Sequence, residues 1–212
     1  MSSEELAGLR YGVGGGLAFV VSGPSGAGKN SVINRVMESL PGLAFSVSYT
    51  TRARRAREKE GVDYRYVSRQ TFDEYVERGA LIEHVTYLGD DYGTSGDQLE
   101  AVFERGEDAI LNIDVEGARL LQEREIPLPC RFIYVFLTAS SPKHLEARLR
   151  ARGTENDVEI HCRLAVAHEE LQIAPRFDYL VINEVFEEAV DELRSIIVAE
   201  RLRIRRPSST NR

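Results

Sequence analysis

The amino-acid sequence predicts an α/β fold in which helices cover both faces of a parallel sheet. Short apolar runs alternate with amphipathic helical segments along most of the chain, a pattern typical of repeated strand–helix units. The run at 132–137 is apolar throughout, as expected for a strand that is buried on both faces. A glycine-rich turn at 23–28 joins the first strand to a helix, and this arrangement binds phosphate. We therefore expect a three-layer α/β/α protein with a phosphate loop.

Composition narrows the classes of function. The 212 residues suffice for one core with a small insertion. A net charge of −7 disfavours a nucleic-acid-binding surface, and no apolar run reaches the roughly 18 residues of a membrane helix. Cys130 and Cys162 lie far apart without a disulfide or metal-binding pattern, which favours a cytoplasmic protein. We expect neither nucleic acid nor membrane as a partner, and the oligomeric state stays open.

The first strand, at 17–21, leads directly into the phosphate loop. Gly23 to Lys29 match the pattern G-x-x-x-x-G-K in full, so loop amides can surround phosphates while Lys29 reaches the outer ones. The next position, where a serine or threonine hydroxyl normally ligates Mg²⁺, is Asn30. An amide oxygen can also ligate Mg²⁺. Asn30 is therefore a candidate metal ligand, although it is longer than serine.

A basic loop follows the strand predicted at 45–48. Residues 52–59 carry five positive charges among eight residues. Such a run is usually a solvated surface. In an acidic chain that already has a phosphate loop, a second anion site is favoured, because arginine makes bidentate contacts to phosphate.

The next elements form a small, mostly β insertion at about 45–95. Strands are predicted at 62–67 and 81–87, with a turn at 89–91, and a helix at 71–78. Thr71 and Glu74 have the spacing of a capping box at the start of that helix. From residue 96 the strand–helix alternation resumes, with a helix to about 106 and a strand at 109–113.

Asp114 stands at the carboxyl end of that strand and before a helix predicted at 115–124. In parallel sheets, ligands bind beyond the carboxyl ends of the strands. A carboxylate there can hold magnesium-bound water, and it can also cap the following helix. The two roles are compatible.

Two helices, at 142–151 and 156–171, are separated by a break at 153–154. Arg148 and Arg152 are four residues apart on one face, and Arg163 lies on the next helix. This arrangement indicates a hinged lid whose arginines close over transferring phosphates. The alternative is surface arginines paired with neighbouring glutamates. A last strand at 179–183 and a helix at 186–203 complete the pattern.

Taken together, these motifs resemble the guanylate kinase family over roughly residues 17–200. The resemblance rests on segments in one fixed order and spacing: 22–29, 46–52, Arg55, Glu58, 61–64, 81–83, 92–95, 112–117, 148–154, 177–179 and Asn183. Arg54 and Arg57 occupy positions where the family usually has proline and glycine, and Asn30 replaces the usual hydroxyl.

The resemblance implies Mg²⁺-dependent transfer of the γ-phosphoryl group from ATP to GMP. The residues implied for GMP are Ser46, Arg52, Arg55, Tyr64, Glu83, Tyr92, Thr94 and Asp114. Those implied for ATP are Gly23, Pro24, Ser25, Gly26, Ala27, Gly28, Lys29, Asn30, Ser31 and Asn183. Lys29, Arg148, Arg152 and Arg163 would be catalytic, and Asn30, with Asp114 through water, would hold the metal.

The implied organisation has three parts between a flexible leader at 1–16 and a polar tail at 205–212. A core at 17–44, 96–137 and 172–204 would carry a GMP-binding insertion at about 45–95 and a lid at about 138–171. The alternative function is a guanylate kinase-like module that binds protein partners and has weak or no catalysis because of Asn30. Modules of that kind tend to lose the glycines and lysine of the phosphate loop, which this chain retains.

Overall fold

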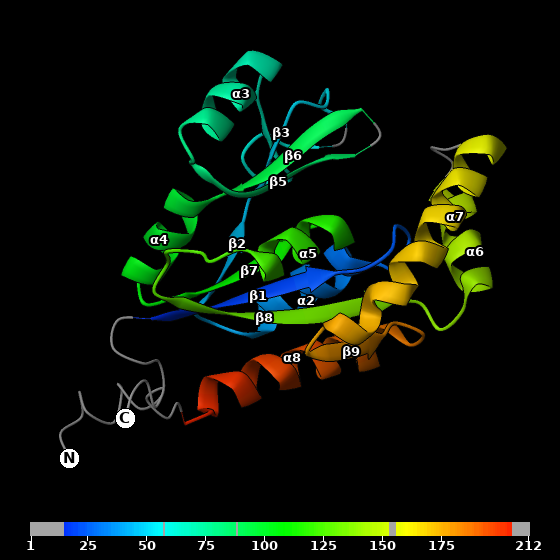
Figure 1. The fold of residues 1–212 in the computed structure, drawn as a ribbon. Helices are drawn as coiled ribbons and strands as arrows, with labels where there is room; N and C mark the ends of the chain where they lie inside the picture. The colour runs from blue at the N-terminus through cyan, green and yellow to red at the C-terminus, as the bar shows by residue number, and fades with distance from the viewer. Residues whose placement is uncertain (1–14, 57, 88, 153–155, 205–212) are drawn as a thin grey trace.

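The computed structural model describes residues 15–56, 58–87, 89–152 and 156–204. The predicted tail and most of the predicted leader lie outside this range. Gly16, assigned to the leader from sequence, is instead the first residue of a core strand and pairs with Cys130. Figure 1 shows a sheet with helices on both faces, a second sheet beside it, and a pair of helices at one end.

Five parallel strands form the core sheet in the order β2-β7-β1-β8-β9. Their bounds are β1 (Gly16–Ser22), β2 (Leu43–Ser46), β7 (Asp108–Asn112), β8 (Cys130–Thr138) and β9 (Tyr179–Ile182). A strand was predicted at 45–48, but β2 begins and ends two residues earlier, so Ser48 lies beyond it. This parallel sheet with its flanking helices confirms the predicted fold class.

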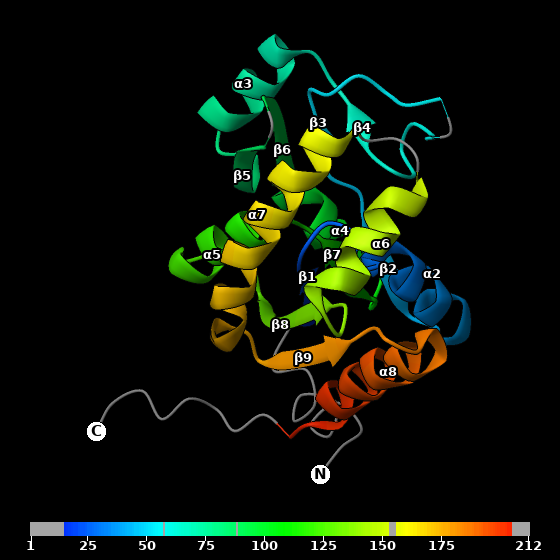
Figure 2. The same cartoon turned by 90° about the vertical axis from the view of Figure 1, so that its right-hand side faces the viewer.

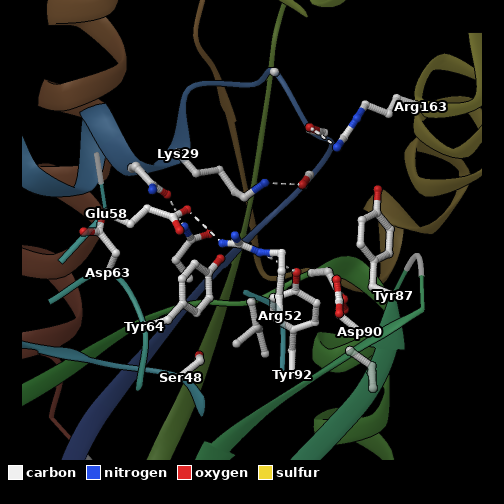
Figure 3. A pocket seen from close by; sticks show the side chains of 18 of the residues that line it. Lys29, Ser48, Arg52, Glu58, Asp63, Tyr64, Tyr87, Asp90, Tyr92 and Arg163 are labelled. Atoms are coloured by element: carbon white, nitrogen blue, oxygen red, sulfur yellow. Dashed lines mark hydrogen bonds and ion pairs between the residues drawn. The ribbon is translucent and has the colours of Figure 1, made fainter. Parts of the chain in front are cut away.

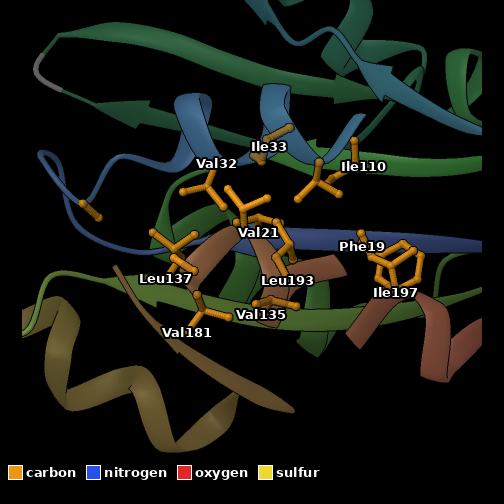
Figure 4. Packing of buried hydrophobic residues seen from close by; sticks show 14 of the residues in the cluster. Phe19, Val21, Val32, Ile33, Ile110, Val135, Leu137, Val181, Leu193 and Ile197 are labelled. Carbon is orange, nitrogen blue, oxygen red and sulfur yellow. The ribbon is translucent and has the colours of Figure 1, made fainter. Parts of the chain in front are cut away.

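Alternate residues of β1 reach the two opposite cores. Leu17, Phe19 and Val21 pack against α2 (Lys29–Ser39) and α8 (Phe186–Leu202). Figure 4 shows Phe19 and Val21 in this core. Ala18 and Val20 belong to the core on the other face, with residues of α4 (Gly96–Glu104) and α5 (Val115–Glu123). Burial on both faces explains the uninterrupted apolar run of this strand.

The second sheet has the order β4-β3-β6-β5. Its strands are β3 (Tyr49–Thr50), β4 (Arg65–Tyr66), β5 (Leu81–Tyr87) and β6 (Asp90–Ser95). The strand predicted at 62–67 is only two residues long. Strand β6 was not predicted, because its polar residues and glycine lack the alternating apolar pattern of a strand. Where a turn was expected at 89–91, β6 begins at Asp90.

Helix α3 (Arg69–Glu77) begins before the predicted start. Its N-cap is Ser68, whose side chain accepts a hydrogen bond from the Thr71 amide, so the predicted capping box at Thr71 is wrong. Helices α6 (Pro142–Arg152) and α7 (Asp157–Ile173) lie together at the carboxyl end of the core strands (Figures 1 and 2), and a short 3₁₀ helix, η1 (Ala174–Arg176), follows.

A buried ion pair ties the far end of α8 to the sheet. The Asp108 carboxylate, 5% exposed, accepts hydrogen bonds from the Leu17 amide at 3.0 Å and from Arg201 Nε at 2.7 Å. Arg201 Nη2 also donates to the Gly42 carbonyl at 2.7 Å. One guanidinium thus joins α8 to the beginnings of β7 and β2.

We expect Asp108→Ala to lower the free energy of unfolding by about 3 kcal/mol, because it removes one partner of a buried pair and orphans the Leu17 amide. Denaturant titration measures the loss. Arg35→Ala, which breaks an exposed pair with Glu38, is the control and should cost less than about 0.5 kcal/mol. Equal losses in the two variants would contradict the role of Asp108.

Candidate active site

A cavity of about 390 Å³ opens where the core sheet, the second sheet and α7 meet (Figure 3). Its wall combines the phosphate loop, the loop after β3, the ends of β5 and β6, and the start of α5. Many of the site residues predicted from the sequence line this cavity: Gly23, Ser25, Gly26, Gly28, Lys29, Asn30, Ser31, Arg52, Arg55, Tyr64, Glu83, Tyr92, Asp114 and Arg163. Segments far apart in sequence therefore share one cavity.

The phosphate loop owes its shape to glycine. Gly23 has φ 136°, and a Cβ there would lie 2.1 Å from the Leu137 carbonyl oxygen, so only glycine fits beside β8. Lys29 Nζ donates to the carbonyl of Gly23 and, at 3.2 Å, to that of Pro24. The lysine thus folds back over its own loop, with its ammonium group at the cavity wall (Figure 3).

Arg148 and Asn183 hold the loop from the side of α6 and β9. Asn183 Nδ2 and Arg148 Nη1 both donate to the Ala27 carbonyl, at 2.8 and 3.1 Å. Arg148 Nη2 also donates to the Asn183 carbonyl at 2.6 Å. Asn183 was expected to bind ATP, and Arg148 to close over the transferring phosphates as a catalytic lid arginine. In this structure the Asn183 amide donates to the loop backbone, and Arg148 donates to the backbone of the loop and of Asn183.

Helix α7 also touches the loop. Arg163 Nη1, on α7, donates to Ser25 Oγ at 3.2 Å (Figure 3). A second cation therefore lies close to Lys29 at the cavity wall. Arg152 is the last residue of α6, and the position of its side chain lies outside the described part of the chain.

The basic loop presents Arg52 to the cavity in a fixed orientation. Its Nη2 is 2.8 Å from Glu58 Oε1, its Nε donates to the Tyr92 hydroxyl at 3.2 Å, and its guanidinium lies 5.4 Å from the Tyr64 ring centre. Burial works against ionisation of Glu58, but the hydrogen bond from Arg52 lowers its pKa to about 2. Arg55 is more exposed, and its amide donates to Glu58 at 2.8 Å. Glu58 thus organises both arginines.

A pair of carboxylates, Glu83 and Asp114, lines another part of the cavity. Glu83, 2% exposed, accepts a hydrogen bond from Thr94 Oγ1 at 2.6 Å, and burial raises its pKa to about 7. Asp114 Oδ1 accepts from the Gly117 amide at 2.6 Å and caps α5, and burial raises its pKa as well. A Cβ at Gly117 would lie 2.8 Å from Glu83 Oε2. Glycine therefore lets both carboxylates approach the start of α5.

Two sequence predictions differ from the geometry. Ser46 is the last residue of β2, 3% exposed, and the serine that lines the cavity from this segment is Ser48. The Asn30 amide oxygen, expected to face a metal, accepts a hydrogen bond from Asn112 Nδ2.

Several cavity residues were missed from the sequence. Glu170, Tyr87, Asp90 and Asn112 all line the cavity. Burial raises the pKa of Glu170 to about 7, opposed by the charge of Lys29. Glu170 follows Arg163 by seven residues, which is about two helical turns, so one face of α7 carries both. That spacing was the available signal.

Comparison with known proteins agrees with this arrangement. A family model described as guanylate kinase matches residues 16–200. A guanylate kinase of Koribacter versatilis is 40% identical over 191 residues, covering 89% of this chain and 80% of that protein. A guanylate kinase of Aliivibrio fischeri is 40% identical, covering 89% and 90%.

A crystal structure of guanylate kinase from Anaplasma phagocytophilum superposes with a TM-score of 0.72 at 32% identity. The match covers 89% of this chain and 87% of that one. The family model spans most of the chain, and the curated relatives are similar along nearly their whole length. The chain belongs to the guanylate kinase family.

Proposed function

We propose that this protein is an ATP:GMP phosphotransferase, which moves the γ-phosphoryl group of ATP to GMP and yields ADP and GDP. The proposal rests on one observation. The phosphate loop, the group formed by Arg52, Arg55, Tyr64 and Tyr92, and the pair Glu83 and Asp114 all line one cavity. A donor site, an acceptor-phosphate site and a base-reading site adjoin one another there. Positioning and charge neutralisation supply most of the rate in phosphoryl transfer.

The acceptor site follows from charge and hydrogen bonding. Arg52, which is held by Glu58 and Tyr92, lines the cavity with Arg55 and Tyr64, and these three residues would bind the acceptor phosphate. Glu83 would accept hydrogen bonds from N1 and N2 of guanine. Adenine has no donor at N1, so it would leave the buried carboxylate unpaired, which selects against adenine. We propose Ser48, rather than Ser46, as the serine of this site.

The donor site uses loop amides and two cations. The loop amides and Lys29 would surround the ATP phosphates, and Arg163 would neutralise charge from α7 as the lid closes. Arg148 and Asn183 keep the loop in shape through the Ala27 carbonyl. A phosphate monoester is already a nucleophile, so the proposal assigns no general base.

Residues near the phosphate loop would hold Mg²⁺ together with ATP, and the ion would supply charge neutralisation for the phosphates. Asp114 fits a role at the metal through water, because a carboxylate offers about four lone-pair sites and the backbone hydrogen bonds from Gly117 and Glu116 use only part of them. Asn30 does not fit the role of a direct ligand equally well, because its amide oxygen is engaged by Asn112.

The activity itself is testable in a coupled assay with ATP, GMP and Mg²⁺. We expect turnover by the wild type and a fall in kcat of about 100-fold or more in Lys29→Ala, which loses a cation aimed at the transferring group. Lys143→Ala, an exposed lysine on α6, is the matched control and should retain wild-type turnover. Wild-type turnover equal to that of a blank without enzyme would contradict the proposal.

Base recognition is tested with Glu83→Gln. We expect kcat/KM for GMP to fall about 100-fold, roughly 3 kcal/mol, while KM for ATP changes less than about twofold. Glu100→Gln, an exposed carboxylate on α4, is the control. Unchanged use of GMP by Glu83→Gln would show that another group reads the base.

A pH dependence follows from the raised pKa of about 7 for Glu83. Below that pH the free protein holds Glu83 protonated, and a protonated carboxyl cannot accept from both guanine donors. We expect GMP affinity to be about tenfold weaker at pH 6 than at pH 8, with proton release on binding. Calorimetry in buffers of different ionisation enthalpy measures both.

The GMP phosphate titrates in the same range, so Glu83→Gln supplies the baseline. That variant retains the phosphate titration and lacks the carboxyl, and its affinity should vary less with pH. The same pH profile in both proteins would count against a titrating Glu83.

A further inference from the structure

A tyrosine of the second sheet fixes the carboxylate that holds Arg52. Tyr66 is the second residue of β4, and its hydroxyl donates to Glu58 Oε2 at 2.7 Å. The Arg55 amide donates to the same oxygen at 2.8 Å, while Glu58 Oε1 accepts from Arg52 Nη2 at 2.8 Å. One oxygen therefore ties the carboxylate to the sheet and the loop, and the other holds Arg52.

The guanidinium of Arg52 keeps donors for a ligand. It has five N–H groups. Within the described part of the chain, Nε donates to the Tyr92 hydroxyl at 3.2 Å, Nη1 to the Ala53 carbonyl at 2.8 Å and Nη2 to Glu58. One N–H group then remains on each terminal nitrogen, and such a pair can make a bidentate contact to phosphate. The direction of this pair depends on the position of Glu58.

Side chains also hold the turn that carries Glu58. Arg54, at a position where the family usually has proline, donates from Nη1 to the Glu58 carbonyl at 2.6 Å. A proline would restrict this turn through its ring, whereas an arginine leaves the backbone free to rotate. Tyr66, by contrast, belongs to a strand and pairs with Thr50 of β3. Its hydroxyl therefore gives the turn a point of attachment on the second sheet.

Tyr66 reaches this group of residues from outside the cavity. Among the described residues, Arg52, Glu58 and Tyr64 line the cavity and Tyr66 does not. Its ring centre lies 6.0 Å from that of Tyr64 and 6.0 Å from the Arg52 guanidinium carbon. Burial and the hydrogen bond to Glu58 raise the pKa of Tyr66, so the hydroxyl keeps its proton and donates it. An effect of this hydroxyl on a ligand would pass through Glu58.

We propose that Tyr66 is a positioning residue for the acceptor phosphate: its hydroxyl fixes the Glu58 carboxylate, which fixes the direction of the Arg52 guanidinium. The inference rests on the proposed use of GMP as acceptor. Because Arg52 would bind the phosphate and Glu83 the base, Tyr66 serves recognition of the phosphate and leaves recognition of the base unchanged.

The variant Tyr66→Phe tests this role, since it removes the hydroxyl and retains the ring. We expect KM for GMP to rise about three- to tenfold and kcat to change less than twofold, because the acceptor phosphate is held before and during transfer. The inhibition constant of guanosine, which has the base and no phosphate, should change less than twofold. Tyr75→Phe, on α3 and outside the cavity lining, is the control and should match the wild type. Thermal melts confirm that each variant is folded.

The route through Arg52 is tested by a double-mutant cycle. In an Arg52→Ala background, Tyr66→Phe should change kcat/KM for GMP by less than about twofold, because the group that it positions is gone. The same loss in both backgrounds would show that Tyr66 acts independently of Arg52 and would overturn the proposal.

Two further results would overturn it. A Tyr66→Phe variant with the wild-type KM for GMP would show that the hydroxyl is not needed, and equal weakening of GMP and guanosine would show a general structural effect. In both cases the wild type still turns over GMP, so the proposed function stands. Absence of turnover by the wild type would overturn the proposed function and this inference together.

Discussion

The arrangement of the site depends on one carbonyl, that of Ala27. Two side chains, Asn183 Nδ2 and Arg148 Nη1, donate to it at 2.8 and 3.1 Å. A carbonyl held on the outer side of a glycine-rich turn leaves the amides of that turn facing inward, where an anion can bind. Because Asn183 follows β9 and Arg148 lies on α6, the loop is set by elements that come more than a hundred residues later. The phosphate site therefore exists only in the folded core.

Much of this arrangement could be predicted from the sequence, and for identifiable reasons. Strand β1 is buried on both faces, so its apolar run marks a central parallel strand without ambiguity. The glycines of the loop are required by backbone geometry, as the close approach of Gly23 to β8 shows. Motifs constrained by backbone or by burial on two faces leave a local signal. The family match then placed several distant side chains in one cavity.

Other features lacked a local signal. Strand β6 is polar and contains glycine, and its pairing with β5 is visible only in three dimensions. Ser46 was carried into the site through the family resemblance, whereas the serine that lines the cavity is Ser48, which lies beyond the end of β2. Glu170 looked like one more charge on a helix. Only the position of α7 over the cavity makes it a partly buried carboxylate whose pKa is raised to about 7.

The basic and acidic parts of the cavity wall, which contain Arg52 and the pair Glu83 and Asp114, differ in how readily their side chains ionise. On the basic wall, Glu58 pairs with Arg52 and keeps a low pKa, so that wall stays ionised and ready for phosphate. On the acidic wall, burial raises the pKa of both Glu83 and Asp114, so their ionisation is costly until a donor arrives. A base that brings hydrogen-bond donors relieves that cost, whereas one without them does not. In the proposed base site, selectivity for guanine would arise from a destabilised free state as well as from contacts in the complex, and both terms would act against a close analogue.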